Sequence, residues 1–243
     1  MQQQPLRKHI QITEIQSIFD SIGLWYDVVS WISTLGIIKL WRRTTSELLL
    51  NRGPLRVLDL GCGTAEQIIS LFVANVPLTS VTGIDISEKM LQVARKKVTV
   101  YKKQSPIFLL QGDMHSLKFE NSFFDAVTLS FGLCFSSDTH QLFSEAARVL
   151  KQDCPLIITE FHRPKTFATF NPYTFYINFV IPGTGRLISG AKESYKKIAT
   201  LINELPDQEV LFSQLKSAGF QKITKYQLFP GLVTQYSAKK RAV

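Results

Sequence analysis

The sequence predicts an open α/β fold with a mostly parallel sheet of seven strands. Short apolar runs alternate with amphipathic helical patterns between residues 56 and 159, which is typical of a parallel sheet covered on both faces. The last two apolar runs, 223–226 and 232–236, are separated only by a short turn at Pro230 and Gly231. Two strands that follow each other so closely pair antiparallel, so we expect a C-terminal hairpin.

The first 52 residues are predicted to form an N-terminal helical cap. Apolar residues recur at helical spacing in residues 10–22, 25–35 and 41–50. A glycine follows each stretch, at Gly23, Gly36 and Gly53, as is common at helix ends. The cap would precede the sheet and lie outside it.

Residues 53–243 are predicted to form the main domain. Its first five strands are expected at residues 56–60, 80–86, 107–110, 126–130 and 156–159. Helices are expected at residues 68–76, 90–98, 142–150 and 209–218, the second of them capped by Ser87. Residues 163–206 would form a helical and aromatic cap insertion.

Composition narrows the class of protein. Among 243 residues, 45% are hydrophobic and 19% charged, which is the balance of a folded chain and excludes disorder as the main state. Cys62, Cys134 and Cys154 form no CxxC pair, so neither a disulfide framework nor a metal site is expected. The first residues lack a secretion signal pattern, and we expect a cytoplasmic protein.

Two features raise the question of a membrane or a nucleic acid. Residues 166–185 lack charge, but only ten of these twenty are hydrophobic, so no transmembrane helix is expected. The net charge is +9, which suits nucleic acid, an anionic membrane surface or plain solubility. The basic residues are scattered, and we expect no nucleic-acid partner.

Residues 58–64 read as a strand, a glycine turn at Gly61 and Gly63, and a helix start. Such a turn lets the backbone approach a ligand closely in front of free N–H groups at the helix N-terminus. A dinucleotide site would have a third glycine where Glu66 stands, and this carboxylate would face the pyrophosphate. No Gly-Lys-Ser/Thr follows, which excludes a P-loop.

Acidic residues at strand ends favour a nucleoside without phosphates. Asp85 lies 22 residues after Gly63, where a carboxylate can accept hydrogen bonds from ribose hydroxyls. Asp113, after the third strand, is placed to reach an adenine amino group. Together with Asp59 and the glycine turn, this pattern favours S-adenosylmethionine (SAM), whose amino-acid end suits the turn.

The chain resembles the UbiE/MenG family of quinone-ring C-methyltransferases over nearly its whole length. Matching motifs are Phe19-Asp20, Tyr26-Asp27, Trp41-Arg42-Arg43, 57–64, 83–91, 112–114, 121–125, 130–132, 148–151, 160–161, 182–185 and 218–220. The resemblance implies a Rossmann-like class I SAM-dependent methyltransferase. It also implies that SAM is held by Asp59, Gly61, Gly63, Thr64, Asp85, Ile86, Asp113, Met114 and Ser130.

The chain departs from the family pattern at two places. Ala65 and Glu66 replace a Gly-Asp pair in the cofactor turn, and we expect alanine to fit there with a negative φ. Cys134 and Phe135 replace an Arg-Asn pair that is thought to help activate the acceptor ring. The second departure leaves the catalytic base open.

The resemblance implies methylation of a ring carbon on a polyprenyl demethylmenaquinol or a related quinol. Candidate catalytic residues are His115, Tyr26 and Asp113, with the imidazole best suited as a base. The aromatic residues in 167–181 could line the acceptor site. They could also rest on an anionic bilayer or form a homodimer interface.

Other functions stay open at this point. The enzyme could methylate another small hydrophobic acceptor, since the Arg-Asn pair is missing. Amino-methylation of nucleic acid is disfavoured, because Ser130-Phe131-Gly132-Leu133 stands where those enzymes usually carry an Asn/Asp-Pro-Pro-Tyr box. The chain could also be a non-catalytic SAM-binding subunit of a quinone-synthesis complex.

Overall fold

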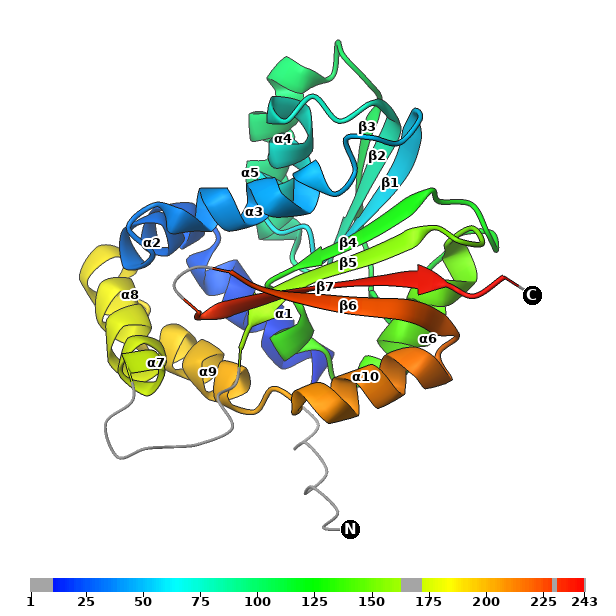
Figure 1. The fold of residues 1–243 in the computed structure, drawn as a ribbon. Coiled ribbons are helices and arrows are strands. Elements are labelled where there is room, and N and C mark those ends of the chain that lie inside the picture. Colours follow the sequence, from blue (N-terminus) through cyan, green and yellow to red (C-terminus); the bar gives the residue numbers. More distant parts are fainter. Residues whose placement is uncertain (1–10, 163–171, 229–230, 243) are drawn as a thin grey trace.

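A computed structural model of the chain describes residues 11–162, 172–228 and 231–242. Its centre is one seven-stranded sheet of order β3-β2-β1-β4-β5-β7-β6 (Figure 1). The strands are β1 (Leu55–Leu60), β2 (Leu78–Asp85), β3 (Ile107–Gln111), β4 (Ala126–Ser130), β5 (Pro155–Phe161), β6 (Phe220–Leu228) and β7 (Val233–Lys240). Strands β1–β5 run parallel, and β7 lies antiparallel between β5 and β6. The predicted sheet and its C-terminal hairpin are confirmed.

Three helices precede the sheet: α1 (Ile12–Ile22), α2 (Tyr26–Ser33) and α3 (Ile37–Glu47). The third begins several residues earlier than the predicted 41–50. Gly36 adopts a left-handed conformation, with φ +79°, and sets the start of α3. From there Ile38, Trp41 and Thr45 form the buried face of the helix.

Helices cover both faces of the sheet. They are α4 (Glu66–Val73), α5 (Glu88–Lys97), α6 (Thr139–Val149) and α10 (Gln208–Ser217), with short 3₁₀ turns η1 (Val98–Tyr101) and η2 (Leu133–Phe135). Val57 and Val81 pack into one core with α4 and α5, whereas Leu58 and Val127 pack into the other with α6 and α10. Because helices cover both faces, β1 and β4 are buried at nearly every position.

A second group of helices follows β5: α7 (Pro172–Phe175), the π-helical turn η3 (Tyr176–Val180), α8 (Ile181–Ser189) and α9 (Lys192–Asn203). In Figure 1 these helices lie with α2 at one end of the sheet, beyond the C-terminal ends of the parallel strands. Phe161, the last residue of β5, lines a cavity between α2, η3, α8 and α9. The first part of the predicted insertion, residues 163–171, lies outside the described residues.

Candidate active site

A cleft lies at the C-terminal edge of the parallel strands. Leu60 pairs with Ile84 of β2 and with Leu129 of β4, so these strands end level with one another. The chain order reverses between β1 and β4, the point at which open α/β sheets bind ligands. The cleft has about 830 Å³ of empty space, counting the part open to solvent.

Most of the predicted site residues meet in this cleft. It is lined by Tyr26, Asp59, Gly61, Gly63, Asp85, Ile86, Asp113, Met114, His115 and Ser130. Thr64 is not among the lining residues. It is buried, and its hydroxyl donates a hydrogen bond to Asp27 over 2.5 Å.

The turn between β1 and α4 needs positive φ at three residues. Gly61 has φ +59° and Gly63 has φ +52°. Ala65, the N-cap of α4, has φ +65°, so the expectation of a negative φ is wrong. The left-handed conformation at this N-cap brings the chain from the glycine turn into α4, and it costs alanine about 1–2 kcal/mol.

Asp85 joins the glycine turn to the start of α5. One carboxylate oxygen accepts the Gly63 N–H over 2.7 Å, and the other accepts the Ser87 N–H over 2.9 Å. Ser87 caps α5, as predicted, and donates its hydroxyl proton to Asp20 of α1 over 2.6 Å. Burial raises the pKa of Asp85 to about 6, against the hydrogen bonds from Ser87 and Gly63.

Asp59 is almost completely buried at the end of β1. Its Oδ1 accepts the Thr128 hydroxyl over 2.6 Å, and its Oδ2 has no hydrogen-bond partner among the described residues. Burial raises the pKa of Asp59 to about 7, although the Thr128 hydrogen bond and the charge of Arg42 oppose the shift. The carboxylate therefore lacks one stabilising contact in the cleft.

The two candidate catalytic residues after β3 form a hydrogen-bonded chain. Asp113 Oδ1 lies 2.6 Å from His115 Nδ1, and His115 Nε2 lies 2.8 Å from the hydroxyl of Ser136. Asp113 also accepts the backbone N–H of His115 over 2.9 Å. These contacts at both ring nitrogens fix the orientation of the imidazole in the wall of the cleft. The side chain of His115 is only 10% exposed.

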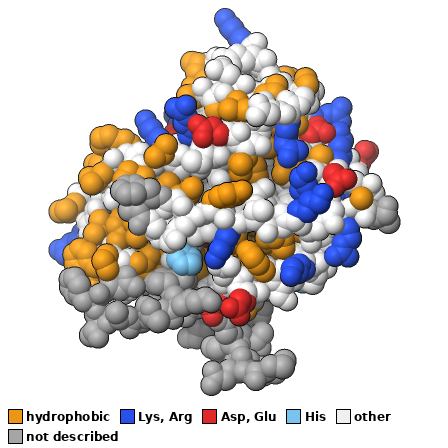
Figure 2. All heavy atoms as spheres, viewed as in Figure 1, with side chains coloured by type: hydrophobic (Ala, Val, Ile, Leu, Met, Phe, Trp, Pro, Cys, Tyr) orange, Lys and Arg blue, Asp and Glu red, His pale blue; other side chains and the backbone are white. Residues whose placement is uncertain are grey.

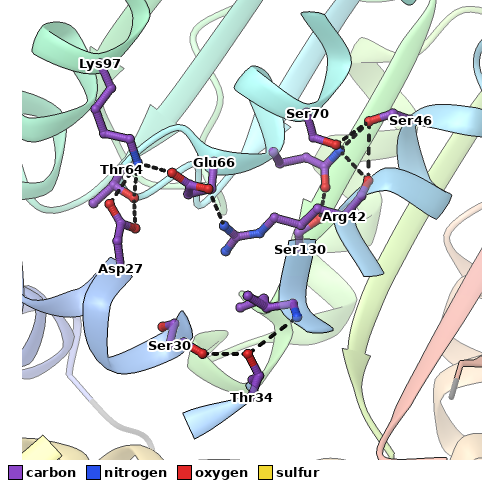
Figure 3. A network of polar contacts seen from close by, with 12 residues as sticks. Asp27, Ser30, Thr34, Arg42, Ser46, Thr64, Glu66, Ser70, Lys97 and Ser130 are labelled. Carbon is purple, nitrogen blue, oxygen red and sulfur yellow. Dashed lines mark hydrogen bonds and ion pairs between the residues drawn. The ribbon is translucent and has the colours of Figure 1, made fainter. Parts of the chain in front are cut away.

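A polar network joins the N-terminal helices to the cofactor turn (Figure 3). The Lys97 ammonium of α5 contacts Asp27 of α2 over 2.8 Å and also pairs with Glu66 at the start of α4. Glu66 lies 3.7 Å from Arg42 of α3. Burial alone would raise the pKa of Glu66, but the hydrogen bond and charge of Lys97 and the charge of Arg42 lower it. The carboxylate of Glu66 is thus paired with Lys97 and Arg42 of the protein itself.

Several lining residues were not predicted as site residues. Arg42, Gln67, Phe19 and Phe135 all face the cleft. Arg42 and Phe19 belong to motifs quoted above, but only the packing of α1 and α3 onto the sheet brings them to this place. Gln67 accepts the Ser130 hydroxyl over 3.0 Å. Cys134 is buried, and its backbone N–H donates to Glu160 over 3.2 Å.

A second cavity adjoins the cleft and shares Tyr26 and Phe131 with it. It has about 450 Å³ of empty space and is lined by Tyr26, Val29, Ser30, Ser33, Thr34, Ile38, Phe131, Phe161, Tyr176, Ile181, Tyr195, Ile198 and Ile202. None of these lining residues is charged at neutral pH, and burial raises the pKa of Tyr176 to about 12. Of the predicted aromatic wall, Tyr176 lies here, whereas Phe167 and Phe170 lie outside the described residues.

The residues present fit SAM. The positive φ values at Gly61 and Gly63 form an open turn, because a Cβ at Gly63 would meet no atom within 4 Å. Asp59 offers an unused acceptor beside this turn, and Asp85 holds two oxygens at the end of β2. Ile86 and Met114 supply apolar surface for a purine.

The fold and the position of the cleft are those of class I SAM-dependent methyltransferases. Solved structures support the fold. The chain matches the [4+2]-cyclase SpnF with a TM-score of 0.71, 15% identity and coverage of 99% of this chain and 100% of that one. It matches a possible histamine N-methyltransferase, a SAM-dependent methyltransferase from Thermotoga maritima, with a TM-score of 0.63, 20% identity and coverage of 93% and 100%.

Sequence comparison identifies the family. Residues 7–240 match the model of the ubiE/COQ5 methyltransferase family, and the chain belongs to this family. It is 32% identical to the demethylmenaquinone methyltransferase of Bacteroides fragilis, covering 93% of this chain and 92% of that protein. It is 30% identical to the ubiquinone/menaquinone biosynthesis C-methyltransferase UbiE of Stutzerimonas stutzeri, covering 93% and 89%. The chain is a methyltransferase that uses SAM.

Proposed function

We propose that the protein transfers a methyl group from SAM to a ring carbon of a polyprenyl demethylmenaquinol or a related quinol. The observation that supports this most directly is the uncharged cavity that adjoins the cleft and shares Tyr26 and Phe131 with it. An apolar ring with a prenyl substituent suits such a cavity. Relatives over nearly the whole chain are named for this chemistry.

SAM supplies an electrophilic methyl group, so the chain has to position the acceptor carbon and make it nucleophilic. Alignment of the reacting atoms can lower the barrier by about 7–11 kcal/mol. The acceptor becomes more nucleophilic when a ring hydroxyl loses or shares its proton. A group in the cleft wall must therefore take that proton.

His115 is the proposed base. Asp113 accepts from Nδ1 of the ring, which leaves Nε2 as the nitrogen able to accept a proton, and Ser136 lies against Nε2. A rotation of the Ser136 hydroxyl frees this nitrogen for the acceptor. Burial raises the pKa of Tyr26 to about 12, so its phenol stays protonated and serves as a hydrogen-bond donor. Asp113 is then a positioning residue, while it keeps the proposed contact with adenine.

His115→Gln tests this assignment. We expect kcat to fall about 10²- to 10⁴-fold, the usual contribution of a positioned base. The SAM dissociation constant, measured by calorimetry, should stay within about threefold. His140→Gln is the matched control, because His140 is exposed on α6. An unchanged kcat in His115→Gln would exclude His115 as the base.

The acceptor class is tested with the purified protein, SAM and a reduced acceptor. Methylated product from demethylmenaquinol, identified by mass spectrometry, is the expected result. Turnover of another hydrophobic acceptor, without turnover of demethylmenaquinol, would instead identify a methyltransferase of another small hydrophobic acceptor. Binding of SAM without turnover of any quinol would favour a non-catalytic subunit, and in that case Cys134→Arg with Phe135→Asn should restore activity.

An exposed apolar face on the cap suggests where the substrate is taken up. Tyr26, Val29, Ser30 and Ser33 line the second cavity from one side of α2. The other side of α2, the residues that flank this helix and the neighbouring α7–α8 segment expose large apolar side chains, namely Leu24, Trp25, Val28, Trp31, Ile32, Leu35, Phe175, Phe179 and Leu187. Hydrophobic side chains gather over this part of the molecule in Figure 2. Exposed apolar patches of this kind mark interaction sites.

We infer that this face rests on an anionic lipid bilayer. Lys39 and Arg186 are exposed on the adjoining helices, whereas Asp27, the acidic residue of α2, is paired with Lys97. The face thus combines apolar side chains with positive charge, the pattern that binds anionic lipid surfaces. No helix in residues 11–162, 172–228 or 231–242 is long and apolar enough to cross a membrane, so the contact would be peripheral.

Co-sedimentation with vesicles tests this contact. The protein should bind phosphatidylglycerol vesicles more than phosphatidylcholine vesicles, and Leu24→Glu with Leu187→Glu should abolish binding. Val100→Glu is the control, because Val100 is 71% exposed on η1, away from the cap. If the double variant instead converted a dimer to a monomer with vesicle binding unchanged, the face would be a homodimer interface.

A further inference from the structure

The uncharged cavity beside the cleft is lined by two phenols whose hydroxyls the described residues do not bind. Tyr176 and Tyr195 both line this cavity, and the hydroxyl oxygen of each is buried with no hydrogen-bond partner among the described residues. A buried hydroxyl in this state has lost its hydrogen bonds to water and gained none in exchange. Two such groups in one cavity therefore indicate a ligand that brings a hydrogen-bond acceptor.

The hydroxyls nearest to these phenols donate to the backbone instead. Ser33 lies near Tyr176 and donates its hydroxyl proton to the backbone of α2 over 3.3 Å. Ser189 lies near Tyr195 and donates to the backbone of α8 over 2.7 Å. Neither serine forms a hydrogen bond with the phenol beside it. The phenol protons thus remain available for a ligand.

The ring of Tyr195, on α9, is held in a fixed position. The residue is 2% exposed, and a Cβ at Gly185 would lie 2.2 Å from a carbon of this ring. The ring therefore packs directly on the bare backbone of α8, which explains the glycine at the end of the motif 182–185. Burial and the nearby Tyr26 raise the pKa of Tyr195, so its phenol stays protonated and can donate.

Tyr176 reaches the same cavity from the π-helical turn η3. Its ring is tilted against that of Phe161, at the end of β5, with 6.4 Å between the ring centres. Turns of this kind are frequent at functional sites. With its pKa at about 12, caused by burial, this phenol is also a donor at neutral pH.

A quinol carries two ring oxygens on opposite sides of its ring. One of them has to meet the base in the cleft if the ring carbon is to become nucleophilic. Tyr26 and Phe131 line both the cleft and the second cavity, so a ring held between them turns its other oxygen toward that cavity.

We propose that Tyr176 and Tyr195 donate hydrogen bonds to this second ring oxygen and thereby select an acceptor that carries it. This inference rests on the proposed function and identifies the group by which the acceptor is recognised. A site that donates to an oxygen of its substrate rejects an analogue without that oxygen, because the buried donors are then left unpaired.

Binding of demethylmenaquinone with one prenyl unit tests the two contacts without turnover. The oxidised ring keeps both oxygens as acceptors, and quenching of tryptophan fluorescence reports its binding with S-adenosylhomocysteine present. We expect Kd to rise about 3- to 10-fold in Tyr195→Phe and about 10- to 100-fold in Tyr176→Phe with Tyr195→Phe. Tyr226→Phe is the matched control, because Tyr226 is 54% exposed on β6. Unchanged SAM binding in calorimetry shows that the variants are folded.

Steady-state kinetics with two reduced acceptors separates recognition of the oxygen from packing of the ring. For the quinol, KM should rise about 3- to 10-fold in Tyr195→Phe, with kcat within about threefold of the native value. The second acceptor is the prenylated 1-naphthol that lacks only the second hydroxyl. Native protein and Tyr195→Phe should have the same KM for this naphthol, since neither can donate to an oxygen that is absent.

Two results would overturn this inference. The double variant could bind the quinone as tightly as the native protein, or Tyr195→Phe could lose affinity for the naphthol as much as for the quinol, which would indicate a packing role. A native protein that binds the quinone but methylates no quinol would instead refute the proposed function. The quinone Kd values would still decide whether the two tyrosines bind the ring oxygen.

Discussion

The cleft and the cavity beside it share Tyr26 and Phe131, but the other side chains that line them differ in charge. The cleft is lined by Arg42, Asp59, Asp85 and other ionisable groups at the ends of parallel strands. The lining of the second cavity is uncharged, with phenols, hydroxyls and aliphatic side chains from the cap helices. Of these two cavities, only the cleft is lined by charged residues.

The difference matches the two ligands of a methyltransferase that acts on an apolar acceptor. A nucleoside with a zwitterionic end requires fixed charges, and the sheet provides them from rigid positions. An apolar acceptor requires a cavity whose uncharged lining excludes water. Tyr26 lies at the boundary, where methyl transfer would take place.

Gly61→Val should have the largest effect on the cleft. Gly61 has φ +59°, a conformation that a β-branched residue adopts only with strain. We expect SAM binding to weaken about 100-fold or more, measured by calorimetry. Gly53→Ala is the control, because a Cβ at Gly53 meets no atom within 4 Å and its φ is ordinary. Native SAM binding by Gly61→Val would contradict the placement of the cofactor at this turn.

Asp59→Asn in the cleft should change how the free energy of unfolding depends on pH, whereas a substitution in the uncharged cavity should not. The pKa of Asp59 is about 7, above the value of about 3.9 in an unfolded chain, so the folded state holds this proton more tightly. The free energy of unfolding therefore falls as the pH rises from about 4 through 7. We expect the variant to be about 2 kcal/mol more stable than the native protein at pH 8, because the uncharged amide avoids the buried carboxylate.

The measurement is urea denaturation at pH 5 and pH 8. At pH 5 the native carboxyl is protonated, and the two proteins should differ less. Tyr176→Phe, in the uncharged cavity, should show the same stability difference from the native protein at both pH values. An equal pH dependence in the native protein and Asp59→Asn would show that Asp59 is not the group responsible.

Ser30→Leu should affect the second cavity alone. Ser30 lines this cavity from α2, and a leucine there would occupy part of its 450 Å³. We expect KM for the quinol acceptor to rise about 10-fold, with SAM affinity unchanged. Ser213→Leu on the exposed face of α10 is the control. Equal loss of affinity for both ligands would mean that the two cavities do not act separately.

Ala65→Gly should have the smallest effect and the opposite sign. Glycine removes the strain of φ +65° at the N-cap of α4, but it also adds conformational entropy to the unfolded chain. We expect a net gain of about 0.5 kcal/mol in the free energy of unfolding. Ala94→Gly, within α5, should lose about 1 kcal/mol or more. Both changes can be measured by urea denaturation, and a loss of stability in Ala65→Gly would contradict the strain.

Much of the sheet and the cleft was predictable because their signals are local. The apolar runs, the glycine turn and the acidic residues at strand ends lie within a few residues of the structures they form. The end of each parallel strand reaches one edge of the sheet, so Asp59, Asp85 and Asp113 had to converge. Ser87 caps α5 for the same local reason.

The sequence by itself thus determined the sheet, the turn and the acidic strand ends, since periodicity and turn chemistry depend on near neighbours. Tertiary structure alone decided that Arg42 reaches the cofactor turn, that Glu66 pairs within the protein, and that α2 lines a cavity on one side. These depend on how α1–α3 and α8–α9 pack over the strand ends, through contacts between residues far apart in the chain. The left-handed φ of Ala65 was set by the turn between β1 and α4, whose geometry prevails over the preference of alanine.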